Sequence, residues 1–164
     1  MPAHYNVLFL CTGNSARSIM AEAILNFKGH PTFTAYSAGS HPTGSVRPEA
    51  LRQLELANLP IAGLRSKSWD EFAKPGAPEM NFVFTVCDNA AKEPCPLWPG
   101  QPMTAHWDIP DPAAVTGTPD EIERAYREGF MMLECRIGLL LSLPIASLGR
   151  LAIQNEIERI GREQ

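Results

Sequence analysis

The chain has 164 residues and a mass of 18.0 kDa, enough for one domain over residues 1–164 that buries about two-thirds of its unfolded surface. Its 45% hydrophobic and 20% charged residues are usual for a globular protein. The net charge of −4 argues against a nucleic-acid-binding surface, so any anion must be attracted by a local positive site.

The sequence also indicates where the protein is located and whether it binds a metal or a cofactor. The amino terminus lacks a basic segment before its apolar run, and the richest apolar stretch, 137–148, is too short to cross a membrane. We therefore expect a cytoplasmic monomer, whose four cysteines are catalytic or metal-binding rather than disulfide-bonded. No Cys-x-x-Cys or His-Glu-x-x-His pattern occurs, so we expect no metal site and no cofactor.

Residues 11–18 (CTGNSARS), called the anion loop below, separate a predicted strand at 5–10 from a helix that begins at about Arg17. The apolar face of that helix is expected to contain Met20, Ile24 and Phe27. Such a loop aims successive N–H groups and the positive end of a helix at one point, which favours an oxyanion site. Six residues after Cys11, the Arg17 guanidinium can grip two oxygens of a tetrahedral anion.

Cys11 is the candidate nucleophile of this loop. The N–H groups that bind an anion also stabilise a thiolate, so we expect the Cys11 thiol to lose its proton readily. A lone cysteine at a strand end is usually an inert buried thiol, but the short polar loop between strand and helix favours a functional site. The expected anion-binding residues are Thr12, Gly13, Asn14, Ser15, Ala16 and Arg17.

The following segment predicts a second strand and two helices. Residues 32–38 alternate in polarity, which indicates a strand. Pro48 suits an early position of a helix. The apolar side of this helix is expected to hold Leu51, Leu54 and Leu56. Ser68, followed three residues later by Glu71, predicts a short helix with a capping box.

A second cysteine follows another predicted strand. Residues 81–87 are an apolar run of strand length that ends in Cys87. The irregular stretch 88–103 is rich in proline and contains Cys95; a loop of this length is usually functional or mobile. A last short strand is predicted at 104–107.

The carboxyl-terminal part predicts a long helix. Thr118 is a candidate N-cap, with Pro119 at the first helical position. The core face of the helix is expected to include Ile122, Phe130, Leu133, Ile137 and Leu140. Pro144 interrupts it, and helix is expected to continue to about Ile160. Cys135 within it is expected to be a buried or half-buried thiol.

Strands that alternate with helices predict an α/β fold with a parallel sheet, helices on both faces and right-handed crossovers. Ligands bind such sheets beyond the carboxyl ends of the strands. Cys11, Cys87 and Asp111 all follow such ends, so three reactive side chains are expected at one edge of the sheet.

The anion loop, the run FTVCD at 84–88, the pair Cys95-Pro96 and the run HWDIPDP at 106–112 together resemble the thioredoxin-coupled arsenate reductases, which are built on the low-molecular-weight protein tyrosine phosphatase fold. The resemblance covers residues 7 to about 143. It implies a three-layer α/β fold with a four-stranded parallel sheet flanked by helices. Phosphatases share the anion loop, whereas the second and third cysteines favour the reductases.

By this resemblance, Cys11 attacks arsenate and Arg17 clamps its oxygens, and phosphate or sulfate could mimic the substrate. Ser18 hydrogen-bonds the Cys11 thiolate. Asp111 is the general acid, although spacing alone does not choose it over Asp108.

The resemblance also implies a disulfide relay. Cys87 attacks Cys11 to release arsenite, Cys95 takes the disulfide over from Cys11, and thioredoxin reduces the resulting bond. Two thiols that form one disulfide supply the two electrons that arsenate reduction needs, and a third thiol can carry the disulfide to the surface. Glutaredoxin with glutathione stays open as the alternative electron donor.

Some family members hold a potassium ion near the anion loop with residues that match Asn14, Glu22 and Ser37. Here Lys67 stands in place of a carboxylate of that site, and its ammonium would compete with the ion. We therefore predict no potassium dependence and expect Asn14 to brace the loop by hydrogen bonds.

Two other functions remain open. A phosphatase acting on phosphotyrosine or small phosphomonoesters is disfavoured by Asp111-Pro112-Ala113, because phosphatases usually carry an aromatic residue after Asp-Pro. A redox-sensing or anion-binding module would need no general acid.

Overall fold

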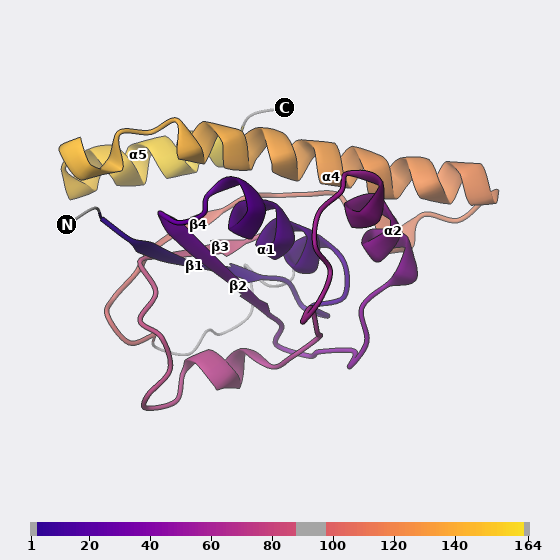
Figure 1. Ribbon diagram of the computed structural model, residues 1–164, viewed down its shortest axis with the longest axis horizontal. Helices are drawn as coiled ribbons and strands as arrows, with labels where there is room; N and C mark the ends of the chain where they lie inside the picture. The colour runs from indigo at the N-terminus through magenta and orange to yellow at the C-terminus, as the bar shows by residue number, and fades with distance from the viewer. Residues whose placement is uncertain (1–2, 88–97, 163–164) are drawn as a thin grey trace.

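The computed structural model describes residues 3–87 and 98–162, and it has a four-stranded parallel sheet in the order β2-β1-β3-β4 (Figure 1). The strands are β1 Tyr5–Leu10, β2 Phe33–Ala38, β3 Phe82–Thr85 and β4 Met103–His106. The α-helices are α1 Arg17–Lys28, α2 Pro48–Leu56, α4 Pro119–Leu141 and α5 Arg150–Gly161. Three short 3₁₀ helices are η1 Trp69–Phe72, η2 Pro112–Ala114 and η3 Ile145–Ser147. The α/β fold with a four-stranded parallel sheet is confirmed.

Strand β1 is central and is buried on both faces. It pairs in parallel with β2 on one side and with β3 on the other. Val7 and Phe9 belong to the larger hydrophobic cluster, whereas Leu8 and Leu10 belong to a second cluster on the opposite face. A strand covered on both faces reads as a continuous apolar run, as residues 7–10 do.

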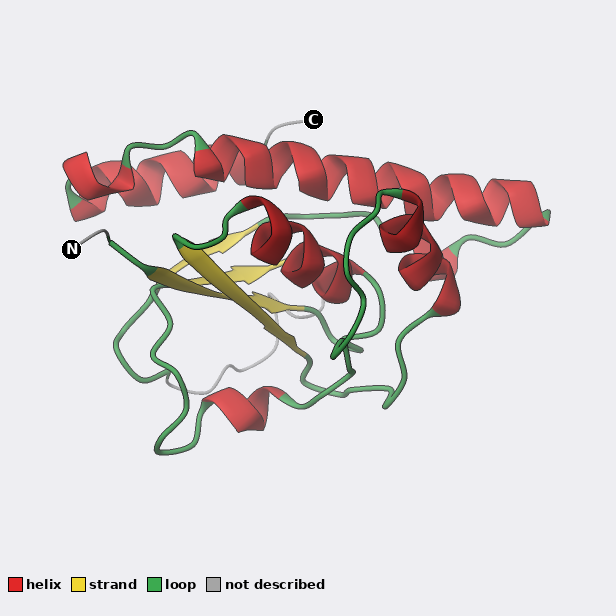
Figure 2. Ribbon diagram, in the orientation of Figure 1, coloured by secondary structure: helices red, strands yellow, loops and turns green. Residues whose placement is uncertain are grey.

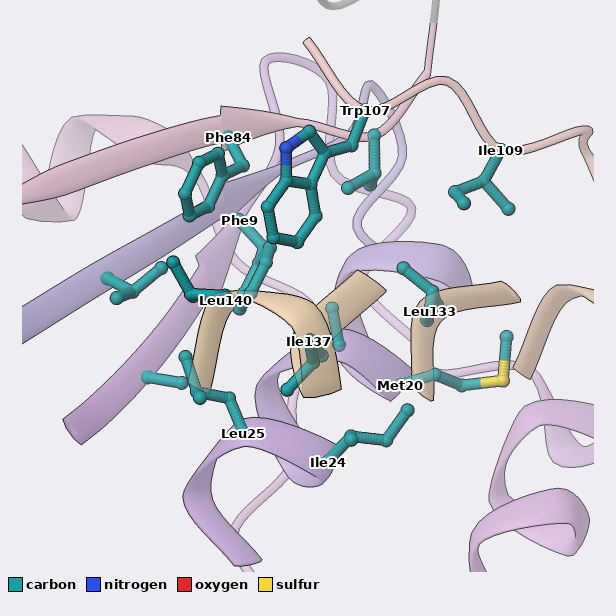
Figure 3. Close-up of a cluster of buried hydrophobic side chains, with 14 of the residues drawn as sticks. Phe9, Met20, Ile24, Leu25, Phe84, Trp107, Ile109, Leu133, Ile137 and Leu140 are labelled. Carbon is teal, nitrogen blue, oxygen red and sulfur yellow. The ribbon is translucent and has the colours of Figure 1, made fainter. Parts of the chain in front are cut away.

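The larger cluster lies between the sheet and helices α1 and α4 (Figure 3). Phe84 of β3 stacks on Trp107, with ring centroids 4.1 Å apart. Helix α1 contributes Met20, Ile24 and Leu25, and helix α4 contributes Leu133, Ile137 and Leu140. Figure 2 shows η1 on the opposite face of the sheet, and Trp98, which precedes β4, packs against the cluster on that face. The two faces are therefore covered unequally in the described part of the chain.

Three helix side chains that were predicted to be buried or half-buried are exposed. Phe27 and Leu56 are 57% and 61% exposed, and the Cys135 thiol is also exposed. The core faces of α1 and α2 instead include Leu25 and Gln53. The predicted burial of Phe27, Leu56 and Cys135 was therefore wrong.

The two predicted helix caps had different outcomes. Thr118 forms a full capping box with Glu121 at the start of α4. At η1, the Ser68 hydroxyl accepts a hydrogen bond from the N–H of Asp70, and the Glu71 carboxylate forms a two-pronged ion pair with Arg65 instead. The predicted short helix and its Ser68 N-cap are therefore found, but the capping box is not, because Glu71 has a charged partner.

Helix α5 packs along strand β4. The indole N–H of Trp107 donates to the carbonyl of Ile157 over 3.0 Å, and Gln154 Nε2 donates to the carbonyl of Thr104 over 2.8 Å. Arg150 donates to the carbonyl of Gln101.

No helix within residues 3–87 and 98–162 is long and apolar enough to cross a bilayer.

Candidate active site

The candidate residues of the described chain meet at the carboxyl edge of the sheet. Cys11 follows β1, Cys87 follows β3 and Asp111 follows β4. Because these three strands are adjacent and parallel, their carboxyl ends lie side by side. The predicted gathering at one edge is therefore found for these strands. Cys95 lies within 88–97, outside the described residues.

The carbonyl groups of the anion loop bind partners outside the loop. Their donors are His41 N for Thr12 O, Thr43 N for Gly13 O, Arg47 N for Ser15 O and Met20 N for Ala16 O, at 2.8–3.0 Å. Asn14 has a φ of 45°, in the left-handed region that asparagine tolerates. Because these four carbonyls are bound outside the loop, we infer that the N–H groups of the loop face its interior, as an oxyanion site requires.

Cys87 lies against this loop and next to Cys11. Its Sγ accepts a hydrogen bond from the N–H of Thr12 over 3.3 Å. A side-chain hydrogen bond to Cys87, together with burial, raises the pKa of the Cys11 thiol, while Arg17 and the N–H of Gly13 act in the lowering direction. The expectation that Cys11 loses its proton readily considered the loop alone, whereas the neighbouring thiol of Cys87 acts in the opposite direction.

Arg17 joins the anion loop to residues 108–111, called the acid loop below. Its Nη1 donates to the carbonyl of Ile109 over 2.9 Å, and its Nη2 lies 3.5 Å from Asp111 Oδ2. The Asp111 side chain is 43% exposed and also caps η2, because Oδ1 accepts from the N–H of Ala113 over 3.0 Å. An exposed carboxyl beside the anion-binding arginine is placed to exchange a proton with a bound ligand and with water.

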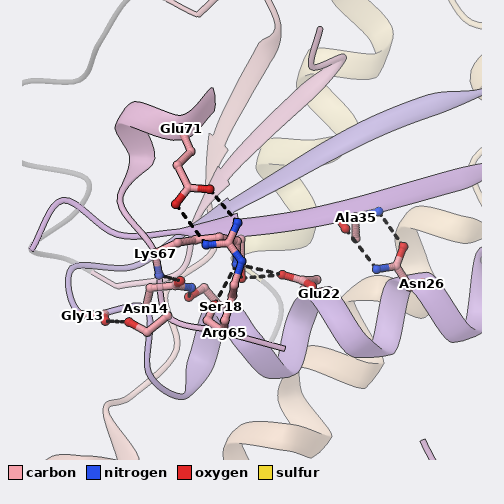
Figure 4. A network of polar contacts seen from close by, with 11 residues as sticks. Gly13, Asn14, Ser18, Glu22, Asn26, Ala35, Arg65, Lys67 and Glu71 are labelled. Atoms are coloured by element: carbon pink, nitrogen blue, oxygen red, sulfur yellow. Dashed lines mark hydrogen bonds and ion pairs between the residues drawn. The ribbon is translucent and has the colours of Figure 1, made fainter. Parts of the chain in front are cut away.

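A buried polar network braces the anion loop from behind (Figure 4). Asn14 Nδ2 donates to the hydroxyl of Ser18 over 2.8 Å, and Asn14 Oδ1 accepts from the N–H of Lys67 over 2.8 Å. Ser66 Oγ donates to the carbonyl of Gly13. These bonds agree with the expected bracing role of Asn14, which is fully buried.

The ammonium of Lys67 lies among oxygen atoms next to this network. Its Nζ is 3.6 Å from Glu22 Oε1 and donates to Ser37 Oγ and to the carbonyl of Arg65. Burial lowers the pKa of Lys67, and the Glu22 carboxylate acts in the opposite direction. The ammonium thus lies beside Glu22 and Ser37, as expected if it competes with a cation there.

One residue of the site was missed from the sequence. Arg136 on α4 is buried, and its Nη1 donates to the carbonyl of Asp108 over 2.6 Å. A signal existed, because Arg136 lies three residues after Leu133 and four before Leu140, within the apolar stripe of the helix. Asp108 itself is an exposed residue.

Clusters of side chains that could hold a metal ion were sought among the described residues. No three His, Cys, Asp or Glu side chains gather in residues 3–87 and 98–162. His106 instead shares a hydrogen bond with the hydroxyl of Thr85.

Known proteins resemble this chain in sequence and in fold. Residues 6–151 match the family model described as "Low molecular weight phosphotyrosine protein phosphatase". The chain is 35% identical over 115 residues to an arsenate reductase of Oceanobacillus iheyensis and 34% identical to one of Bacillus subtilis, covering 70% of this chain and 79% of each relative. Among solved structures, an arsenate reductase from Archaeoglobus fulgidus superimposes with a TM-score of 0.65 at 28% identity, covering 84% of this chain and 99% of that one. The thioredoxin-dependent arsenate reductase Cg_ArsC1′ of Corynebacterium glutamicum, at 22% identity and a TM-score of 0.56, shares the fold over 84% of this chain and 64% of its own.

Proposed function

Because this chain belongs to the low molecular weight phosphotyrosine protein phosphatase family, we propose that it is an arsenate reductase in which Cys11, Cys87 and Cys95 react in turn. Relatives named arsenate reductase, 34–35% identical to this chain, support this activity. The observation that carries the proposal is the position of Cys87, whose sulfur lies on the anion loop 3.3 Å from the N–H of Thr12. Phosphoryl transfer needs one thiol at this loop, whereas arsenate reduction needs two.

In the first proposed step, the Cys11 thiolate attacks arsenic and forms an As–S bond. Arsenate binds the inward N–H groups of the anion loop and the fork of Arg17. An arsenic-bound oxygen leaves as water after it receives a proton from Asp111, which already lies beside Arg17. Ser18, whose oxygen accepts from Asn14, keeps its own O–H proton to donate to the thiolate.

In the second step, the sulfur of Cys87 attacks Cys11 Sγ. The S–S bond forms and the As–S bond breaks, so its electron pair passes to arsenic, which leaves as arsenite. Cys87 Sγ begins this attack from its place at the anion loop, where it accepts from the N–H of Thr12 over 3.3 Å.

In the third step, Cys95 attacks Cys87 and releases Cys11 as a thiol, which leaves a disulfide between Cys87 and Cys95. Thioredoxin then reduces this disulfide in the cytoplasm, where thiols are kept reduced. Glutaredoxin with glutathione is the alternative donor.

The test is NADPH consumption with arsenate, thioredoxin and thioredoxin reductase, run on the wild type and on Cys87→Ser. The same proteins are assayed for hydrolysis of p-nitrophenyl phosphate. Arsenate turnover that disappears in Cys87→Ser, while any phosphatase activity persists, is the expected result. Brisk phosphatase activity without arsenate turnover would instead identify a phosphatase.

A further inference from the structure

The buried arginine of α4 contacts the backbone of the acid loop and has no part in the mechanism above. Arg136 is 5% exposed, and it donates to the carbonyl of Asp108 over 2.6 Å. Burial of a guanidinium is costly unless its N–H groups are paired. A buried charge that binds this loop therefore points to a role in placing it.

Arg136 and Arg17 together hold two consecutive carbonyls of the acid loop. Arg136 reaches the first carbonyl from α4, and Arg17 reaches the second, that of Ile109, over 2.9 Å from the anion loop. Only Pro110, whose φ is fixed by its ring, separates Ile109 from Asp111. These two hydrogen bonds therefore restrict where the Asp111 carboxyl can lie.

The two arginines differ in what else they must bind. Arg17 also pairs with Asp111 at 3.5 Å, and in the proposed reaction it grips the oxyanion with two N–H groups. Its contacts with the acid loop thus compete with the substrate for the same planar set of donors. Arg136 lies outside the anion loop, so its bond to the Asp108 carbonyl does not depend on a bound anion.

We infer that Arg136 is a positioning residue, which keeps the acid loop and its Asp111 carboxyl over the anion site when Arg17 turns to the bound oxyanion. The inference rests on the proposed function through the role of Asp111 as general acid. Proton transfer requires the acid within hydrogen-bonding reach, and a displacement of about 1 Å can cost about a hundredfold in rate. Loss of Arg136 therefore lowers kcat and leaves oxyanion affinity unchanged.

The kinetic test compares Arg136→Met, Arg136→Lys and the control Arg127→Met, which changes an exposed arginine of the same helix. Arsenate turnover, inhibition by phosphate and thermal unfolding are measured for each. Arg136→Met is expected to lower kcat by about ten- to a hundredfold, less than the roughly 10²–10⁴-fold contribution of a general acid. Phosphate inhibition stays unchanged, Arg136→Lys recovers part of the rate, and Arg127→Met behaves as the wild type. A loss of phosphate affinity equal to the loss of rate would overturn the inference.

A double-variant cycle shows whether Arg136 acts through Asp111. In the Asp111→Asn background, Arg136→Met is expected to cause no further loss of kcat, because the acid that it positions is already absent. If the two substitutions instead lower kcat multiplicatively, Arg136 acts independently of Asp111 and the inference is overturned.

A structural readout separates this inference from the choice of substrate. Crystals of the wild type and of Arg136→Met are prepared with inorganic phosphate, which requires no turnover. The wild type is expected to keep the Arg136–Asp108 bond with Asp111 over the anion, and Arg136→Met to show the acid loop displaced. An acid loop in the same place in both crystals overturns the inference, whereas absent arsenate turnover by the wild type overturns only the proposed function.

Discussion

Thr12 donates its backbone N–H to the sulfur of Cys87, so the second cysteine occupies a donor of the anion loop. The same cysteine is hydrogen-bonded to Cys11 and raises the pKa of its thiol. An incoming oxyanion must therefore share the loop with Cys87. The two thiols that the proposed mechanism uses in turn are therefore coupled.

Replacement of Cys87 by alanine is expected to lower the pKa of Cys11. The change removes the hydrogen bond that raises this pKa, while Arg17 and the N–H of Gly13 still stabilise the thiolate. At neutral pH, Cys11 should then react faster with iodoacetamide, as measured by mass spectrometry across a pH series. The control is Cys135→Ala, which removes an exposed thiol on α4. An unchanged pH profile for Cys11 in Cys87→Ala would contradict the coupling.

Replacement of Lys67 by methionine is expected to destabilise the fold. The ion pair with Glu22 is buried, with the two side chains 7% and 14% exposed, so its loss leaves an uncompensated carboxylate. Breaking one side of such a pair costs about 3–5 kcal/mol, measurable by urea unfolding. The double variant with Glu22→Gln should recover much of this loss.

The matched control for this pair is Arg52→Gln. Arg52 pairs with Glu123 over 3.3 Å, but its side chain is 63% exposed, so the change should cost less than about 1 kcal/mol. Equal losses of unfolding free energy in Lys67→Met and Arg52→Gln would show that the buried ion pair stabilises the fold no more than the exposed one.

Activity is expected to be the same in potassium and sodium salts. The Lys67 ammonium already interacts with Glu22, Ser37 and the carbonyl of Arg65, which are oxygen groups of the kind that a hard cation prefers. Lys67→Ala should in turn acquire a potassium dependence. Turnover is compared in the two salts at constant ionic strength, and stimulation of the wild type by potassium would refute the expectation.

Replacement of Gly39 by alanine is expected to disturb the anion loop. A Cβ at this position would lie 2.7 Å from the carbonyl oxygen of Cys11 and closer still to that of Thr12. Both are backbone atoms, so the loop must shift, at a cost of about 1–3 kcal/mol and with weaker phosphate binding. Calorimetry with phosphate measures the second effect.

Gly138→Ala is the control for this change. Nothing lies within 4 Å of a Cβ at this position of α4, and alanine is a better helix former than glycine, by about 1 kcal/mol. Thermal unfolding should show Gly138→Ala as slightly more stable than the wild type. If Gly39→Ala were also as stable as the wild type or more so, the close approach of Gly39 to the anion loop would not affect stability.

Local sequence signals predicted the frame of the site well. The end of β1, the start of α1 at Arg17 and the cap at Thr118 depend on neighbouring residues, and all three are found. The prediction that Cys11 and Cys87 lie together at the carboxyl edge of the sheet followed from the expected parallel strands, which are found.

Features that depend on distant partners were not predictable from the sequence. Phe27 has a helical spacing that suits burial, but α1 turns Leu25 to the core instead. Arg136 lies on an apolar stripe, and its contact with a carbonyl 28 residues away is not visible in the local sequence. The raised pKa of Cys11 likewise requires the position of Cys87, which is 76 residues further along the chain.

The packing of α5 on β4 has a consequence for the behaviour of the protein at high concentration. Strand β4 is at the edge of the sheet, and an uncovered edge is a template for pairing with strands of other molecules. Gln154 and Arg150 bind carbonyls of this region, at Thr104 and Gln101, so these acceptors are already taken. Helix α5 thereby covers part of this edge, and we expect variants that loosen it to aggregate before they lose the chemistry of the site.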